Sequence, residues 1–177
     1  MRGGVIFIFC IAFLWGGSTL EKDFFSAIES GKLSQARMIA RKGCDGGDLF
    51  ACAMLGSFYE EGLGGVDANL SKAKALYHRA CEGGEMRGCT NLGNLYALGK
   101  GVRQDYARAI EYYTAACGKE EAGGCFGLGM MYSRGNGVIR DSYRAFKLFQ
   151  KACYFGMPLG CQAVREMTKE HGQNRGK

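Results

Sequence analysis

The chain has 177 residues, of which 23% are charged and 47% hydrophobic, and its formal net charge is +6 at pH 7. The Lys and Arg residues are scattered, without the basic blocks or interleaved aromatic residues that are typical of nucleic-acid and lipid binding. The charge therefore indicates a basic, solvated helix surface, and we expect no nucleic-acid partner.

Residues 1–18 are predicted to be a secretory signal peptide. Arg2 precedes an apolar run from Val5 to Trp15, and small residues follow it. The run is shorter than the roughly 20 residues that a transmembrane helix needs, so an uncleaved membrane anchor is the weaker alternative. Cleavage after Ser18 predicts a secreted or periplasmic chain with no stable membrane insertion. Cys10 lies inside the run with no lipobox before it, so we do not expect lipidation.

The segment 21–43 predicts a helical hairpin that is broken at Ser30 and Gly31. Each half carries an apolar stripe at spacings of three and four, formed by Phe24, Ala27 and Ile28 and then by Leu33, Ala36, Ile39 and Ala40. We expect this hairpin to be an irregular first repeat that caps one end of a repeat array.

From Cys44 onward the sequence repeats itself. Cys44 and Cys81 are 37 positions apart, and the next two steps, to Cys117 and Cys153, are 36 positions each. The extra residue falls in the loop 62–66, where an insertion leaves the helix lengths unchanged.

The first half of each unit begins at Cys52, Cys89 or Cys125 and predicts a helix. Leu at plus three, Gly at plus four and Tyr at plus seven fall on one helix face with the cysteine. The glycines, Gly56, Gly93 and Gly129, each cost about 1 kcal/mol relative to alanine within a helix. We therefore expect them to permit the close approach of a neighbouring helix. The tyrosines are expected to fill the space one turn further on, and they are Tyr59, Tyr96 and Tyr132.

The second half of each unit predicts another helix, with Asn69, Asp105 or Asp141 as its N-cap. Alanines alternate with aromatic rings or leucines along its predicted buried face, at Ala73, Leu76, Tyr77 and Ala80, at Ala109, Tyr112, Tyr113 and Ala116, and at Ala145, Leu148, Phe149 and Ala152. Such a seam lets two helices pack closely. The stretch from Cys161 to Gly172 abandons the pattern and predicts a capping helix.

These segments together predict an all-α fold. We expect an αα-hairpin solenoid with a right-handed superhelix over residues 19–172, built from about four units and the capping helix, and a flexible tail over 173–177. The array is expected to be a monomer.

Eight of the nine cysteines remain after removal of the signal peptide, and they pair at a separation of eight positions. An even set at fixed spacing in an exported chain is typical of a disulfide framework. Repeat symmetry favours four local bonds, Cys44 to Cys52, Cys81 to Cys89, Cys117 to Cys125 and Cys153 to Cys161. Zinc sites prefer shorter cysteine steps or added histidines, and the only histidines are His78 and His171, so we expect no metal and no cofactor.

The motif LGxxYxxGxGVxxDYxxAxxYYxxAC in a 36-residue unit resembles the Sel1-like repeat, a relative of the tetratricopeptide repeat. With a cysteine pair in every unit and a predicted signal peptide, the chain is similar to the Helicobacter cysteine-rich protein family over about residues 22–167. It departs from the pattern at Asn69 and in the longer loop 62–66. The resemblance implies an exported protein with weak penicillin-binding or β-lactamase-like activity, or one that recognises a peptide or host protein.

The residues give the enzyme interpretation little support. One SxxK sequence, Ser71 to Lys74, occurs without the SDN and KTG motifs that complete a serine β-lactamase site. Ser71 lies opposite the predicted buried face of its helix, so we expect an ordinary exposed serine, and the catalytic residues stay unknown.

A binding function is the alternative interpretation. If the first helix of each unit lines the concave side, positions plus two, plus five and plus nine face a ligand. These candidate binding residues are Met54, Ser57, Glu61, Asn91, Asn94, Leu98, Met130 and Arg134, together with Gly127. Asn91 and Asn94 are suited to a peptide backbone, because a side-chain amide both donates and accepts hydrogen bonds. A plain polar helix face explains the same pattern equally well. The expected ligand is a peptide or protein, with a peptidoglycan fragment or a β-lactam as further candidates.

Overall fold

The computed structural model describes residues 19–173, and this part of the chain consists of nine helices joined by short turns and loops. They are α2 (Thr19–Glu29), α3 (Leu33–Asp45), α4 (Leu49–Glu61), α5 (Leu70–Glu82), α6 (Met86–Leu98), α7 (Tyr106–Gly118), α8 (Ala122–Arg134), α9 (Ser142–Tyr154) and α10 (Pro158–Gln173). The predicted signal peptide lies outside the described residues. Within residues 19–173, no helix has the length and apolar character needed to cross a membrane.

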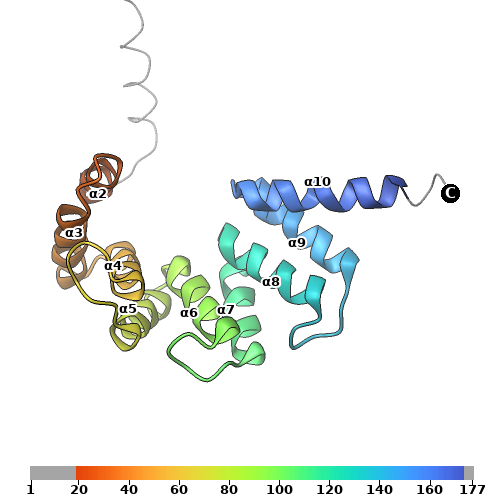
Figure 1. Cartoon of the computed structure of the whole chain (residues 1–177), viewed down its shortest axis with the longest axis horizontal. Coiled ribbons are helices and arrows are strands. Elements are labelled where there is room, and N and C mark those ends of the chain that lie inside the picture. The colour runs from red at the N-terminus through yellow and green to blue at the C-terminus, as the bar shows by residue number, and fades with distance from the viewer. Residues whose placement is uncertain (1–18, 174–177) are drawn as a thin grey trace, which may run out of the picture.

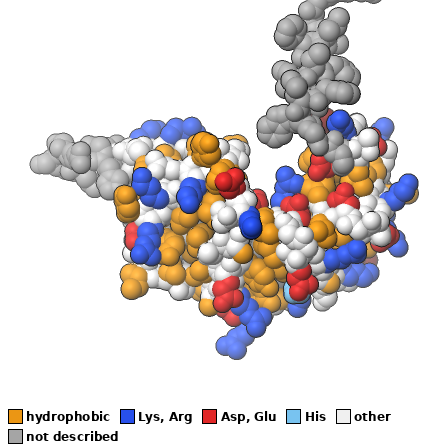
Figure 2. Space-filling model, turned by 180° about the vertical axis from the view of Figure 1, so that it is seen from behind, with side chains coloured by type: hydrophobic (Ala, Val, Ile, Leu, Met, Phe, Trp, Pro, Cys, Tyr) orange, Lys and Arg blue, Asp and Glu red, His pale blue; other side chains and the backbone are white. Residues whose placement is uncertain are grey.

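Consecutive helices pack against each other and build an open arc with α2 and α10 at its ends (Figure 1). Seen from behind, a notch separates the two ends of the arc (Figure 2). α6 contacts both α4 and α8, whereas no contact of comparable extent joins α5, α7 and α9 in the described part of the chain. Because stacked elements approach most closely on the inside of a curve, we call α4, α6 and α8 the inner helices and α5, α7 and α9 the outer helices. The predicted αα-hairpin solenoid is confirmed.

The helix ends are fixed by the predicted caps. The side chains of Asn69, Asp105 and Asp141 accept hydrogen bonds from backbone N–H groups three residues on, at 2.9, 3.1 and 2.8 Å. The inner helices have side-chain caps of their own, which the sequence analysis did not identify: Asp48, Glu85 and Glu121. Each inner helix then ends at a glycine in the left-handed region, Gly62, Gly99 or Gly135, because an L side chain is strained there.

The four predicted disulfides are present, and each joins the end of one hairpin to the start of the next helix. In the second bond, Cys81 of α5 is tied to Cys89 of α6 with a Cα–Cα distance of 4.6 Å. A loop of this length gives about 2 to 3 kcal/mol of stabilisation by restricting the unfolded chain. Disulfides of this number are typical of proteins outside the reducing cytoplasm, so the chain is assigned to an extracytoplasmic compartment.

Beside each disulfide, two small residues let the helix backbones meet. A Cβ on Gly88 would lie 2.7 Å from the Cβ of Ala80, so only one methyl group fits between α5 and α6. At the first disulfide the glycine precedes the alanine in the chain: a Cβ on Gly43 would lie 2.7 Å from the Cβ of Ala51. At the third and fourth disulfides the alanine again precedes the glycine, and the pairs are Ala116 with Gly124 and Ala152 with Gly160.

The mid-helix glycines make room for aromatic rings. A Cβ on Gly93 would lie 2.6 Å from Cε1 of Tyr113, and the same ring would meet a Cβ on Gly127 at 2.5 Å. Gly56 faces Tyr77 and Gly129 faces Phe149 in the same way. The glycines therefore permit a close approach, as predicted, and the group that approaches is the ring of an outer helix. The tyrosines predicted to fill the space one turn further on, including Tyr96, are half-buried there and pack against the core clusters.

The two ends of the array are closed by unlike helices. In α2, Phe24 is buried and meets the rings of Phe50 and Phe58 edge-on, at centroid distances of 6.1 and 6.2 Å. The helix α10 begins at Pro158, earlier than the predicted start at Cys161, and it includes Gln173. Gln173, which was assigned to the flexible tail, is therefore helical, and residues 174–177 lie outside the described residues.

The contact between Gly93 and Tyr113 gives a prediction about stability. Gly93→Ala should lower the free energy of unfolding by about 1 to 3 kcal/mol, because overpacking outweighs the gain of about 1 kcal/mol in helix propensity. Urea unfolding followed by circular dichroism measures the change. Gly118→Ala is the matched control, because Gly118 ends α7 with nothing within 4 Å of its Cβ position. Equal effects of both substitutions would contradict the packing account.

Candidate functional site

The SxxK pair lies on the solvent side of an outer helix. Ser71 and Lys74 are both exposed in the first turns of α5. Neither side chain makes a hydrogen bond or ion pair with another described residue, so no base is positioned on the Ser71 hydroxyl. His78 pairs with Glu82 on the same helix, with 3.1 Å between Nδ1 of His78 and Oε2 of Glu82. Among residues 19–173, no group of three or more His, Cys, Asp or Glu side chains could hold a metal ion.

Two of the predicted binding residues belong partly to the core. Met54 packs against the buried cluster that contains Phe24 and Phe50, and Met130 packs against the cluster that contains Tyr113. Both methionines are half-buried. Their apolar character is therefore accounted for by packing within the solenoid.

Ser57 and Asn94 are partners of buried tyrosines. The Tyr113 hydroxyl donates to Asn94 Oδ1 at 2.7 Å, and the Tyr77 hydroxyl lies 3.2 Å from Ser57 Oγ and 2.7 Å from Glu60 Oε2. Burial raises the pKa of Tyr113 to about 12 and also raises the pKa of Tyr77 above its usual value. Both hydroxyls are therefore protonated donors at neutral pH.

The third unit supports this explanation of the plus-five position. There the outer-helix ring is Phe149, which has no hydroxyl group, and the equivalent inner-helix residue is the apolar Met130. The residue at plus five is thus polar in the two units whose outer-helix ring is a tyrosine, and apolar in the unit whose ring is a phenylalanine. The residue type at this position therefore depends on the buried ring of the outer helix as well as on exposure to solvent.

Glu61 takes part in a link between units. Lys100, in the α6–α7 loop, donates to Glu60 Oε1 and Glu61 Oε1, both at 2.8 Å. These hydrogen bonds raise the pKa of Lys100 above its usual value. A second link joins the buried Thr90 of α6 to Glu121, the N-cap of α8. Neighbouring units are therefore connected by polar contacts as well as by the disulfides.

Three further predicted binding residues have side chains that make no hydrogen bond or ion pair with another described residue: Asn91, Leu98 and Arg134. Leu98 is the most informative of them, because 71% of its surface is exposed at the end of α6. Asn91 is half-buried in the same helix, and Arg134 is exposed at the end of α8. All three lie on inner helices, on a scaffold that the disulfides and rings hold in place.

A polar frame, which the sequence analysis missed, recurs in the loop between each inner and outer helix. In the second unit, Arg108 stacks over the Tyr96 ring at 5.3 Å from its centroid and donates to its hydroxyl at 3.1 Å. The same arginine pairs with the N-cap Asp105 at 3.6 Å, and Asp105 N donates to Tyr96 O at 2.9 Å. Equivalent stacking joins Lys72 to Tyr59 and Arg144 to Tyr132. In the sequence, the tyrosine that recurs at plus seven of each inner helix was the feature that could have indicated this frame.

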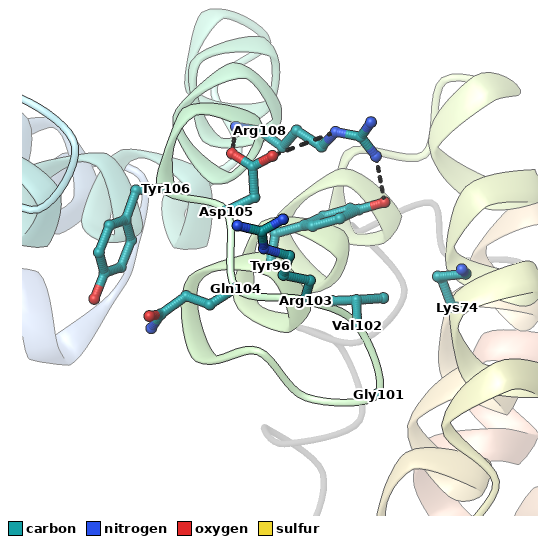
Figure 3. A pocket seen from close by; sticks show the side chains of 9 residues that line it. All are labelled: Lys74, Tyr96, Gly101, Val102, Arg103, Gln104, Asp105, Tyr106 and Arg108. Atoms are coloured by element: carbon teal, nitrogen blue, oxygen red, sulfur yellow. Dashed lines mark hydrogen bonds and ion pairs between the residues drawn. The ribbon is translucent and has the colours of Figure 1, made fainter.

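The frame of the second unit lines a pocket of about 840 Å³. Figure 3 shows Lys74 of α5 at one end and Tyr106 of α7 at the other, with Tyr96, Arg103 and Arg108 between them. The remaining wall is the loop 101–105. The first unit has a smaller counterpart of about 520 Å³, lined by Tyr59, the loop 65–69 and Lys72.

Comparisons with known proteins agree with this architecture. A family model described as the Sel1 repeat matches residues 49–85, 87–119 and 122–154, which correspond to α4 with α5, α6 with α7 and α8 with α9. No curated protein sequence matches the chain at a significant level.

Three solved structures show the extent of the similarity. A Sel1 repeat protein from Oxalobacter formigenes has a TM-score of 0.70 at 26% identity, over 74% of this chain and 52% of that one. Cysteine rich protein B of Helicobacter pylori has a TM-score of 0.56 at 32% identity, over 83% of this chain and 98% of that one. A protective antigen of uropathogenic Escherichia coli strains has a TM-score of 0.63 at 24% identity, over 76% of this chain and 28% of that one. The chain thus spans about half of the Oxalobacter protein.

The pairing of Asn94 with Tyr113 gives a second prediction. Asn94→Met should lower the free energy of unfolding by about 1 to 3 kcal/mol, because it removes the acceptor of a buried hydroxyl. Adding Tyr113→Phe should restore most of the loss, because the double variant copies Met130 and Phe149 of the third unit. A double-mutant cycle by urea unfolding measures the coupling. Additive effects of the two substitutions would show that the hydrogen bond does not determine the residue at plus five.

Proposed function

Because the chain belongs to the Sel1 repeat family, we propose that its disulfide-stapled solenoid is an exported scaffold that binds a peptide or protein partner along its inner helices. Support for export comes from the predicted signal peptide and the four disulfides, and the destination is the periplasm or the exterior. The partner is a peptide segment of a host or cell-envelope protein.

The observation that carries the proposal is the exposed end of α6. Leu98 presents an apolar side chain with 71% exposure, although its neighbours at equivalent positions, Glu61 and Arg134, are charged. Such an exposed apolar side chain stabilises a complex when a partner removes it from water, by about 25 cal/mol per Å² of apolar surface buried. Asn91 lies in α6, two residues after the disulfide-bonded Cys89, and is half-buried, and its side chain supplies an amide for a peptide backbone. A rigid surface lowers the entropic cost of binding.

Selection of peptides on the purified oxidised chain tests this proposal. Peptides from a random phage library should bind with an affinity that falls by about tenfold or more in Leu98→Ala, because an apolar anchor is worth about 1 to 3 kcal/mol. Isothermal titration calorimetry with the synthetic peptides gives the dissociation constants. Thr114→Ala, at an exposed position of the outer helix α7, is the control and should leave them unchanged. Selected peptides that bind Leu98→Ala as tightly as the wild type would contradict binding at the inner helices.

The β-lactamase activity implied by the family resemblance has no structural observation in its favour. Ser71 and Lys74 lie exposed on α5 and do not hydrogen-bond to each other. We expect the purified wild-type protein to hydrolyse a chromogenic β-lactam no faster than the Ser71→Ala variant. The variant measures the background rate of hydrolysis. If the wild type hydrolyses the β-lactam and Ser71→Ala does not, the protein is also an enzyme, and binding alone does not account for its function.

A further inference from the structure

The three loops between inner and outer helices share one frame but differ on its rim. The shared part is the tyrosine of the inner helix, the N-cap of the outer helix and the cation stacked on the tyrosine. Two rim positions vary from unit to unit. The residue two positions before the N-cap is Asp67, Arg103 or Ile139, and the facing residue of the preceding helix is Arg37, Lys74 or Ile110.

Contacts of the loop glycines establish which helix each loop faces. A Cβ on Gly64 would meet Arg37 of α3, one on Gly101 would meet Leu70 of α5, and one on Gly137 would meet Ile110 of α7. Lys74 lies one turn after Leu70 on α5, as Ile110 lies one turn after Tyr106 on α7. The three loops are therefore equivalent sites with different chemistry.

Only the middle loop, among these three, carries cations at both rim positions. In the first loop, Arg37 already donates its Nε to Gly64 O at 2.8 Å, and the other rim residue is the acidic Asp67. In the third loop, both rim residues are isoleucines, and Ile139 is 91% exposed. The rim chemistry thus changes from mixed charge to basic to apolar along the arc.

The cations of the middle pocket outnumber its acids. Lys74, Arg103 and Arg108 line it together with a single carboxylate, that of Asp105. Asp105 is occupied, because it accepts from the backbone of Arg108 at 3.1 Å and pairs with its side chain at 3.6 Å. Lys74 and Arg103 have no hydrogen-bond or ion-pair partner in the described part of the chain. Both groups have only donors, so a ligand that satisfies them must bring acceptors.

We propose that this pocket binds a carboxylate of an acidic peptide segment, held between Lys74 and Arg103. Charge-assisted hydrogen bonds from a guanidinium and an ammonium group to a carboxylate are among the stronger polar contacts in proteins. The volume of about 840 Å³ admits a Glu or Asp side chain with its adjoining backbone. Tyr106 and Val102 offer apolar surface for the methylene groups of that side chain. The site is distinct from Leu98 on the inner helices and does not require a ligand there.

An NMR titration of the isotopically labelled oxidised chain tests the proposal. The probe is a capped hexapeptide of glutamate, and its comparisons are a capped hexapeptide of glutamine and inorganic phosphate. We expect the glutamate peptide to shift the amide signals of residues 101–108 and of Lys74, and the glutamine peptide to leave them in place. Equal shifts with phosphate at the same concentration would overturn an acidic peptide as the ligand class.

Two double variants separate the pocket from general surface charge. Lys74→Ile with Arg103→Ile copies the third unit and should weaken binding of the glutamate peptide by about tenfold or more. Arg140→Gln with Lys151→Ala copies the second unit and removes the same charge elsewhere, so its affinity should stay within about twofold of the wild type. Dispersed NMR spectra and unchanged circular dichroism establish that both variants are folded.

Equal weakening by the two double variants, or shifts spread over the whole surface, would overturn the pocket. Neither result affects peptides that depend on Leu98, so failure of this inference and failure of the proposed scaffold function are distinguishable.

Discussion

The structure depends on the close crossing between the end of one helix and the start of the next, where a disulfide and a single methyl group lie between the backbones. Ala80 with Gly88 shows the constraint, and Gly43 with Ala51 satisfies it with the two residues exchanged. Because only one Cβ fits, the backbones approach closely at each crossing, and the disulfide-bonded Cα atoms lie 4.5 to 4.6 Å apart in all four bonds. The disulfide beside it restricts the unfolded chain, which matters in repeats that bury little surface on their own.

That spacing places the ring of each outer helix on a glycine of the inner helix. The ring of Tyr113 reaches through to α8 as well, where Gly127 receives it. Its hydroxyl emerges beside Asn94, so part of the inner surface is determined by the core beneath it. Positions that look variable in sequence are therefore of two kinds. Asn94 varies with a buried partner, whereas Leu98 has no such partner and presents its side chain to solvent.

The loops follow a similar division between fixed and variable parts. Tyr96, Asp105 and Arg108 satisfy one another and hold the backbone of the loop through the hydrogen bond from Asp105 N to Tyr96 O. With this frame closed, the rim residues are free to change without disturbing the fold. Lys74 and Arg103 are the result in the middle unit: two cations that the fold does not need, facing one pocket.

The sequence alone determined the helices, the N-caps of the outer helices, the cysteine pairs and the order of the repeat, because these depend on local spacing that recurs three times in the chain. It also predicted that the mid-helix glycines permit a close approach. Only the tertiary structure decided that Tyr113 is the group that approaches Gly93, and that Asn94 serves its hydroxyl. It alone brought Lys74 of one unit to the loop of the next. These contacts join residues from different helices, and the curvature of the stack, which no local pattern encodes, decides which side chains meet.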